Sequence, residues 1–138
     1  MAQKVFVDTN IIVDFLMKRE PFDIPAALLF NKADLGEIEA CVSASVFPFL
    51  FYLLTKSLRS KKDAWQTFNK FRLLVSPLPV DAKVVDLSLA SDFKDLEDAM
   101  QYQIALQNNV SVFLTRNLKD FEKSAIPVMT AETFLKSK

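Results

Sequence analysis

Short apolar runs alternate along the chain with longer segments whose apolar residues recur at helical spacing, and this alternation constrains the fold more than any other feature. Near-continuous apolar runs are typical of strands buried on both faces, as in parallel sheets covered by helices. Two shorter runs are bounded by proline, which suits strand starts and edge strands. The five expected strands are residues 5–7, 38–42, 77–80, 110–114 and 126–129.

Helical segments lie between these strands and after the last one, so that strand and helix alternate throughout. Such alternation is typical of an α/β fold with a mainly parallel sheet that is covered on both faces. No repeat, low-complexity tract or long linker interrupts the pattern, and we expect a single domain over residues 1–138. The expected helices are residues 11–16, 25–35, 46–58, 62–74, 82–91, 97–108 and 131–136.

The scarcity of histidine, glycine and cysteine excludes several kinds of chemistry. The chain has no histidine, so no histidine-based triad, histidine-ligated zinc or histidine acid–base step can operate. The single glycine, Gly36, cannot supply a G-x-G-x-x-G or Walker-type phosphate loop. The single cysteine, Cys41, allows no intramolecular disulfide and no cysteine zinc cluster, and it suits a reducing compartment. The remaining chemistry is mainly that of carboxylates, hydroxyls, amides and ammonium groups.

The charge balance predicts no general affinity for polyanions. Seventeen basic and seventeen acidic residues cancel, so any contact with nucleic acid must come from local patches. The longest apolar stretch, residues 46–54, contains a proline and is far shorter than the roughly 20 residues of a membrane span. Residues 1–8 lack the pattern of a secretory signal. We therefore expect a cytoplasmic protein that makes no membrane contact.

Polar side chains follow two of the expected strands at the point where each strand ends. The first strand runs into Asp8-Thr9-Asn10, and the fourth ends in Thr115-Arg116-Asn117. In open α/β sheets, ligands bind beyond the carboxyl ends of the strands. Capping and turn formation explain either triplet alone, because Asp, Thr and Asn are good N-caps and turn residues. Because two strands end in similar polar triplets, capping alone explains the pattern less well.

A third polar group opens the helix expected over residues 97–108. With Asp95 at the N-cap, Asp98 falls three residues on and on the same face, which resembles a capping box. Acidic residues near a helix N-terminus also interact favourably with the helix dipole. Capping explains one or two of these acids, but it does not explain why Glu97 adds a third acid within four residues.

Asp8, Asp98 and Asp120 each lie near the start of a helix that follows a buried strand or a connecting loop. Carboxylates that converge repel one another and raise one another's pKa, so such a cluster normally persists because a cation neutralises it. Oxygen ligands without Cys or His select Mg²⁺ or Mn²⁺. Such an ion binds phosphate oxygens and lowers the pKa of a bound water, which predicts hydrolysis of phosphoryl esters without histidine.

These motifs resemble those of the PIN-domain family of small metal-dependent ribonucleases, which includes VapC-like toxins of bacterial toxin–antitoxin pairs. The resemblance covers almost the whole chain, and the order of the motifs in a chain of this length is fairly specific. It rests on Val5-Phe6-Val7-Asp8-Thr9-Asn10, on Asp95-Leu96-Glu97-Asp98-Ala99 and on Thr115-Arg116-Asn117-Leu118-Lys119-Asp120-Phe121.

The resemblance implies a three-layer α/β/α sandwich whose mainly parallel five-stranded sheet has the order 3-2-1-4-5. It also implies an endoribonuclease in which Asp8, Asp98 and Asp120 are the catalytic residues and the ligands of Mg²⁺ or Mn²⁺. Arg116 is a candidate for substrate binding, and Asp95 is interpreted equally well as a helix cap. The supporting residues implied around the acids are Asn10, Thr115, Asn117, Asp95, Glu97 and Ser45.

One position departs from the family pattern. Many members carry an acid on the helix after the second strand, where this chain has Phe49, which cannot bind a metal. The alternative function is therefore that of a catalytically degenerate PIN-like protein, which binds RNA or a protein partner without cleaving. Ser45 could contribute a nearby hydroxyl, although it also suits the N-cap of the helix whose first turn contains Pro48.

Two surface features are candidates for substrate or partner binding. The basic cluster Lys56, Arg59, Lys61 and Lys62 is able to contact phosphates, and it is also explained as the solvated junction of two helices. Residues 46–54 are apolar all round, which predicts a helix buried on most sides, in the core or against another chain. The resemblance implies a homodimer paired through this region, an RNA substrate and an antitoxin partner.

Two other α/β classes place acids at strand ends. A haloacid-dehalogenase-type phosphatase needs D-x-D-x-T, whereas Asp8-Thr9-Asn10-Ile11-Ile12 lacks the second acid. A phospho-receiver needs an acceptor Asp at the end of a middle strand and a Lys after the last strand. The second expected strand ends near Ser43 and the last leads to Thr130, although Asp81 directly follows the third and keeps this class open.

Overall fold

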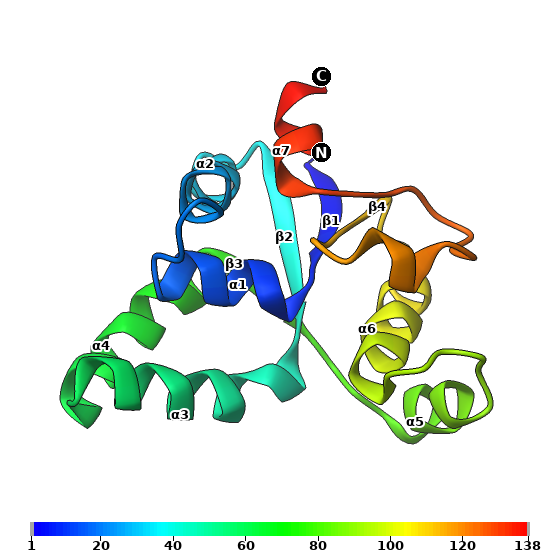
Figure 1. Ribbon diagram of the computed structural model, residues 1–138, viewed down its shortest axis with the longest axis horizontal. Helices are drawn as coiled ribbons and strands as arrows, with labels where there is room; N and C mark the ends of the chain where they lie inside the picture. The colour runs from blue at the N-terminus through cyan, green and yellow to red at the C-terminus, as the bar shows by residue number, and fades with distance from the viewer. Residues whose placement is uncertain (1, 138) are drawn as a thin grey trace.

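The computed structural model describes residues 2–137 and shows a parallel sheet between two layers of helices (Figure 1). The strand order is β3-β2-β1-β4-β5, and every neighbouring pair is parallel. The predicted three-layer α/β/α sandwich and its strand order are therefore confirmed. Met1 and Lys138, the ends of the predicted domain, lie outside the described residues. The strands are β1 (Gln3–Val7), β2 (Ile38–Ser43), β3 (Val75–Leu78), β4 (Val112–Leu114) and β5 (Val128–Met129).

The helices that connect these strands agree with the predicted segments to within a few residues. Two short 3₁₀ segments, η1 and η2, follow β2 and β4 respectively. In chain order the helical elements are α1 (Thr9–Leu16), α2 (Asp23–Asp34), η1 (Ala44–Val46), α3 (Phe47–Leu58), α4 (Lys61–Arg72), α5 (Ala82–Leu89), α6 (Leu96–Gln107), η2 (Leu118–Phe121) and α7 (Ala131–Lys136).

The sheet separates two hydrophobic cores. Val5 and Val7 of β1 pack in one core with α1, α2, α3, α4 and α7, whereas Phe6 packs in the other with α5, α6 and η2. Figure 1 accordingly shows α3 and α4 on one side of the sheet and α5 and α6 on the other. Successive strand residues point to opposite faces. Because both faces of β1 are buried, its run of apolar residues is continuous rather than alternating.

The two strands with neighbouring prolines lie at the edges of the sheet, as predicted. Pro77 lies within β3 and pairs with Val42, and Pro127 directly precedes β5. Proline has no N–H for the ladder and is tolerated at an edge. The predicted bounds of the third strand are wrong by two residues, because Val75 is buried and already pairs with Ala40.

The apolar helix α3 is buried on one face only. Leu50 and Leu54, together with Val46 just before the helix, recur every four residues and face the core. Phe49 and Tyr52 are exposed by 52% and 58%. The prediction of burial on most sides is therefore wrong for this chain taken by itself.

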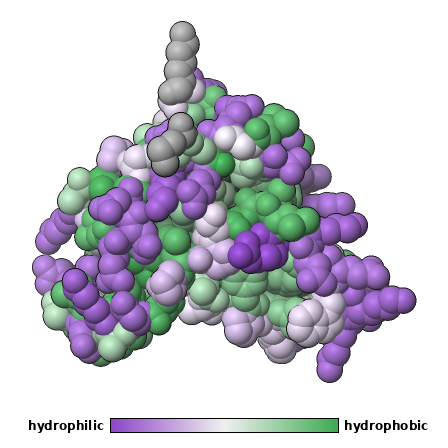
Figure 2. Space-filling model, turned by 180° about the vertical axis from the view of Figure 1, so that it is seen from behind, coloured by the Kyte–Doolittle hydropathy of each residue, from purple (hydrophilic) through white to green (hydrophobic). Residues whose placement is uncertain are grey.

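The surface of the molecule mixes polar and apolar side chains. Figure 2 shows hydrophobic side chains between hydrophilic ones on one face of the molecule. Leu35, Leu73 and Leu89 are among the large hydrophobic residues that are exposed. Within residues 2–137, no helix is both long enough and apolar enough to cross a membrane.

Candidate active site

The three polar motifs meet at one cavity beyond the carboxyl ends of β1 and β4. These strands are neighbours in the sheet, so residues 8–10 and 115–117 leave it side by side. The start of α6 brings the third motif to the same place. The cavity has a volume of about 410 Å³. Its lining residues are Asp8, Thr9, Asn10, Val13, Arg19, Phe49, Leu53, Asp95, Glu97, Asp98, Asn117 and Asp120.

Most of the predicted site residues are brought together in this cavity. Asp8, Asp98 and Asp120 all line it. Thr115 contacts Asp8 from behind, whereas Ser45 and Arg116 are not among the lining residues. The predicted supporting residues that do line the cavity are Asn10, Asn117, Asp95 and Glu97.

Asp8 is the most firmly held acid of the cavity. Its side chain is buried, and its two oxygens accept hydrogen bonds from Thr115 Oγ1 at 2.7 Å and from Gln101 Nε2 at 2.8 Å. Burial raises the pKa of Asp8, and the two hydrogen bonds oppose that rise. Asp8 occupies the N-cap position of α1, but its side chain makes no capping hydrogen bond. The capping interpretation is therefore wrong for Asp8.

Gln101 is a site residue that the sequence analysis missed. It is fully buried, and its Oε1 accepts a hydrogen bond from the backbone N–H of Thr9 at 3.1 Å while its Nε2 donates to Asp8. The Thr9 hydroxyl lies 3.2 Å from the same Oε1 and 3.3 Å from Glu97 Oε2. The available signal was a glutamine three residues after Asp98, on the helix face that carries the acid.

The acids from α6 and η2 lie close enough to repel one another. Partial burial, followed by the charge of Asp8, raises the pKa of Asp98 to about 7. Charges of Asp95, Asp120 and Glu97 contribute to the same rise. The pKa of Glu97 is also raised, by partial burial and then by the charge of Asp8. Asp95 in addition caps α6, because its Oδ1 accepts a hydrogen bond from the Asp98 backbone N–H at 2.9 Å.

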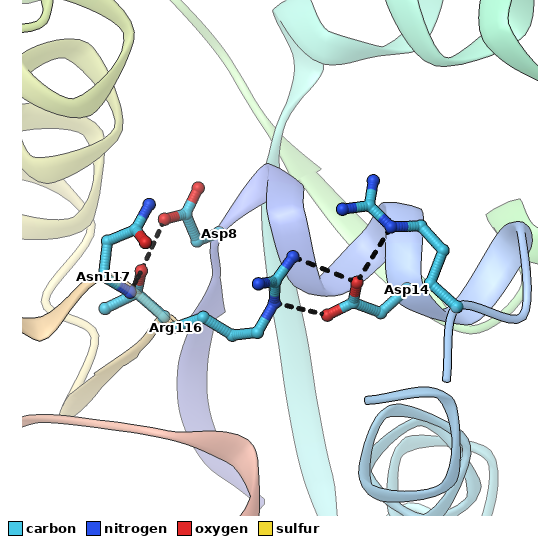
Figure 3. A network of polar contacts seen from close by, with 6 residues as sticks. Asp8, Asp14, Arg116 and Asn117 are labelled. Carbon is cyan, nitrogen blue, oxygen red and sulfur yellow. Dashed lines mark hydrogen bonds and ion pairs between the residues drawn. The ribbon is translucent and has the colours of Figure 1, made fainter. Parts of the chain in front are cut away.

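Arg116 and Asn117 are adjacent in the chain, but their side chains point toward different acids (Figure 3). Asn117 points toward Asp8, and its backbone N–H donates to Thr115 Oγ1 at 3.0 Å. Arg116 donates from Nε and Nη2 to the two carboxylate oxygens of Asp14, at 2.8 and 3.2 Å. Asp14 is buried in α1, so this ion pair ties α1 to the end of β4. Arg116 thus contacts Asp14 and does not line the cavity where we expected it to bind substrate.

Ser45 also lies outside the lining of the cavity, in η1. Its hydroxyl is 2.7 Å from the Ser43 hydroxyl, which accepts a hydrogen bond from the Ser45 backbone N–H at 3.2 Å. Val46 occupies the N-cap position of α3, so the capping prediction for Ser45 is wrong. Phe49 of α3, in contrast, does line the cavity, at the position where the family resemblance implies an acid.

The donor atoms of the cavity fit a hard divalent cation. They are carboxylate and amide oxygens, which Mg²⁺ and Mn²⁺ prefer. Asn10 Oδ1 is buried and has no hydrogen-bond partner, which leaves an oxygen of the lining for a ligand. In the part of the chain that the structure describes, no three His, Cys, Asp or Glu side chains are arranged to hold one ion. Two carboxylates suffice for Mg²⁺, which usually keeps several water ligands.

Comparison with known proteins finds a family and a sequence relative that each match most of the chain. The PIN domain profile matches residues 4–119. The chain is 31% identical over 143 residues to Ribonuclease VapC1 of Aquifex aeolicus (strain VF5). That alignment covers 96% of this chain and 94% of the relative.

Solved structures with the same fold include two bacterial examples. The crystal structure of DNA-bound VapBC from Salmonella typhimurium matches with a TM-score of 0.68 and 21% identity, over 94% of this chain and 98% of that one. A toxin–antitoxin complex from Klebsiella pneumoniae matches with a TM-score of 0.64 and 20% identity, over 92% of this chain and 97% of that one. At these identities the similarity concerns the fold.

Proposed function

The chain belongs to the PIN domain family, and we therefore propose that it is a divalent-metal-dependent endoribonuclease that acts as the toxin of a toxin–antitoxin pair. The relative with 31% identity is a ribonuclease, and a similar fold occurs in a toxin–antitoxin complex. Neither finding names the metal or the residues that hold it. The proposal for these rests on the cavity.

The observation that carries the proposal is the pairing of two different carboxylates in one cavity. Asp8 is buried and hydrogen-bonded through both oxygens, whereas Asp98 is partly exposed and has its pKa raised to about 7 by burial and like charges. Like charges that face one another are stable in their ionised form when a cation lies between them. Without an ion, burial and these charges favour a proton on Asp98, and a divalent cation would relieve the same repulsion.

Asp8 and Asp98 would hold the ion, and Asp120 and Asn10 would add oxygen atoms directly or through water. The chemistry that a divalent ion supplies when bound is neutralisation of phosphate charge and a lowered pKa for the attacking water. Gln101 fixes Asp8 while leaving lone pairs free, because each carboxylate oxygen can accept more than one bond. The chain's own part of the mechanism is therefore to orient these oxygens before substrate arrives.

The reaction would be hydrolysis of a phosphodiester bond in RNA. A water molecule gives up a proton and its oxygen forms a bond to phosphorus, the bond from phosphorus to the leaving ribose oxygen breaks, and the ribose oxygen takes up a proton. Because the chain has no histidine, the proton-transfer groups in the cavity are carboxylates and water. The Asn117 amide, which lines the cavity beside Asp8, would donate a hydrogen bond to a phosphate oxygen.

Cleavage assays with purified protein test this function. We expect cleavage of unpaired RNA with Mn²⁺ or Mg²⁺, loss of cleavage in EDTA, recovery with excess ion, and loss in Asp98→Asn. Asp86→Asn is the matched control, since it removes an exposed carboxylate of α5 that does not line the cavity. Cleavage that persists in EDTA and in Asp98→Asn contradicts the proposal.

The second candidate function is binding of RNA or a protein partner without cleavage. Phe49 favours it, because this side chain lines the cavity where many family members carry an acid. Calorimetry with Mn²⁺ separates the two functions. Heat of binding that disappears in Asp98→Asn supports the nuclease, whereas the absence of both heat and cleavage supports the second candidate.

We also propose that the chain pairs with a second copy and with an antitoxin protein. Tyr52 and Leu58 of α3 and Trp65 of α4 expose apolar surface that a second copy would cover. Light scattering during gel filtration checks this, and a mass of 15.7 kDa at every protein concentration contradicts pairing. Co-purification with the product of a neighbouring gene tests the antitoxin. Cytoplasmic location stays a prediction.

A further inference from the structure

The cavity of the candidate active site has two walls of different chemistry. The acids at the end of β1 and from α6 and η2 form one wall, and the proposed function uses them. The other wall is formed by Arg19, just after α1, and by Phe49 and Leu53 of α3. Among the lining residues, all within residues 2–137, Arg19 carries the only positive charge. In Figure 1, α3 and α6 lie on opposite sides of the sheet. The proposed chemistry leaves this second wall without a role.

Phe49 is set apart from the other phenylalanines of α3. Phe47 and Phe51 pack against Phe68, with ring centroids 5.9 and 5.8 Å apart. Phe49 joins no aromatic pair among residues 2–137, and 52% of it is exposed where it lines the cavity. Binding pockets are typically lined by apolar and aromatic side chains beside a few polar groups. The position of Phe49 therefore fits contact with a flat ligand better than a role in the core.

Arg19 is held beside the cavity while most of its donors stay free. Its backbone N–H donates to the Asp14 carbonyl at 3.1 Å, and its Nε lies 3.6 Å from Asp14 Oδ1. Arg116 already bonds both oxygens of Asp14 at 2.8 and 3.2 Å, so Arg19 is the weaker partner. The Arg19 side chain is 52% exposed. Asp14 thus orients the guanidinium and leaves most of its five N–H donors for another acceptor.

We propose that this wall binds one unpaired nucleotide of the RNA beside the scissile bond, with its base stacked on Phe49 and its phosphate bound by Arg19. The planar guanidinium matches two phosphate oxygens, and an aromatic ring stacks on any base. A base inside a duplex is not free to stack on a side chain, so the wall selects single-stranded RNA. This inference rests on the proposed function of the cavity and adds the residues that recognise the substrate.

Binding of a fluorescently labelled single-stranded RNA tests the role of Phe49 without cleavage when every protein carries Asp98→Asn. Phe49→Ala is expected to weaken binding by about fivefold to 100-fold, the value of one base stacked on an aromatic ring. Phe49→Trp is expected to retain the affinity. Leu28→Ala removes an apolar side chain of α2 that is about as exposed as Phe49 and lies outside the cavity lining, and it is expected to change binding less than about twofold. Equal binding by Phe49→Ala and Leu28→Ala overturns the inference.

Salt dependence tests the role of Arg19. Arg19→Ala is expected to weaken binding and to lower the slope of log Kd against log salt by about 0.7, the value of one phosphate contact on a single strand. Arg19→Lys keeps the charge and is expected to keep the slope with reduced affinity. Lys18→Ala removes the neighbouring exposed charge and is expected to leave the slope unchanged. Equal changes in the slope for Lys18→Ala and Arg19→Ala overturn the phosphate contact.

An abasic nucleotide moved along the RNA locates the stacked base. One abasic position next to the cleavage site is expected to weaken binding when Phe49 is present and to have no further effect in Phe49→Ala. If the abasic position weakens binding equally in both proteins, the inference is overturned. The proposed nuclease function still stands in that case, provided that the unmodified chain cleaves RNA. Absence of cleavage and of Mn²⁺ binding by the unmodified chain overturns the proposed nuclease instead, while binding that depends on Phe49 still supports this wall as a nucleotide site.

Discussion

Asp8 and Asp120 line the same cavity, but the fold holds them in different ways. Asp8 follows β1 and is buried, with both oxygens hydrogen-bonded. Asp120 lies in η2 and is exposed, and within residues 2–137 its carboxylate makes no hydrogen bond or ion pair. A carboxylate locked by packing and hydrogen bonds is preorganised for a ligand, whereas one at the surface loses side-chain entropy when it binds. We therefore expect function to depend on the two acids unequally.

The largest expected effect separates these two acids. Asp8→Asn should lower kcat/KM for RNA cleavage by more than about 100-fold, and Asp120→Asn by about tenfold, because outer ligands typically contribute 10–100-fold. Both substitutions nearly preserve shape and remove one charge. The measurement is cleavage at saturating Mn²⁺. Equal losses in the two variants would show that burial and hydrogen bonding of Asp8 confer no functional advantage.

The next effect concerns the groups that lock Asp8. Gln101→Leu should weaken Mn²⁺ binding by about 10-fold to 100-fold and lower the free energy of unfolding by about 1–3 kcal/mol, because Asp8 then loses a buried hydrogen-bond donor. Calorimetry and urea denaturation measure the two quantities. The control is Gln107→Leu, which changes an exposed residue at the end of the same helix. Unchanged Mn²⁺ affinity in Gln101→Leu would mean that Asp8 needs no such support.

The raised pKa values of the cavity acids should make the stability of the folded chain depend on pH. In the folded chain the pKa of Asp98 rises from 3.8 to about 7, and the pKa values of Asp8 and Glu97 shift in the same direction. Between pH 3.8 and about pH 7 the folded state binds more protons than the unfolded state, so the free energy of unfolding falls as pH increases. In EDTA, the urea midpoint should be higher near pH 5 than near pH 7.5.

Two variations sharpen this pH test. Asp98→Asn should flatten the dependence, because it removes the carboxyl group whose pKa rises to about 7 in the folded chain. Mn²⁺ added near pH 7.5 should raise the midpoint, since an ion that binds only the folded state stabilises it by mass action. A midpoint that rises steadily from about pH 4 to about pH 7 in EDTA would contradict the repulsion between these acids.

The smallest expected effect concerns Asp95, and it distinguishes a role as the cap of α6 from a role of its charge in the cavity. Asp95→Ala removes the acceptor of the 2.9 Å capping bond and should lower the free energy of unfolding by about 1 kcal/mol. Asp95→Asn keeps an acceptor at that position and should remain close to the unmodified chain in stability. Cleavage should change less than about threefold in both. If Asp95→Asn lowers cleavage as much as Asp120→Asn does, Asp95 acts on the ion and not only as the cap of α6.

The sequence predicted the fold and the position of the cavity because both depend on regular patterns. The buried run of β1 and the polar triplets after β1 and β4 follow from strand periodicity. The strand order came from the family resemblance, and that order places Asp8 next to Asn117. Asp95 could be assigned to the start of α6 because N-capping follows local spacing.

The contacts around the acids could not be predicted, because they depend on side chains that meet across the fold. Gln101 reaches Asp8 from a position 93 residues away. Arg116 lies in the right motif, but its Nε and Nη2 donate to the buried carboxylate of Asp14, and Arg19 lines the cavity instead. Periodicity and spacing do not predict which arginine pairs with a buried carboxylate.

Crystals soaked in Mn²⁺ offer the sharpest test of the proposed site, since anomalous scattering locates the ion independently of activity. We predict one strong peak between Asp8 and Asp98, with an oxygen of each carboxylate at roughly 2.0–2.6 Å from the ion. The peak should be lost in crystals of Asp98→Asn. A fully occupied Mn²⁺ site elsewhere with none beside Asp8, in protein that cleaves RNA, would contradict the proposed metal centre.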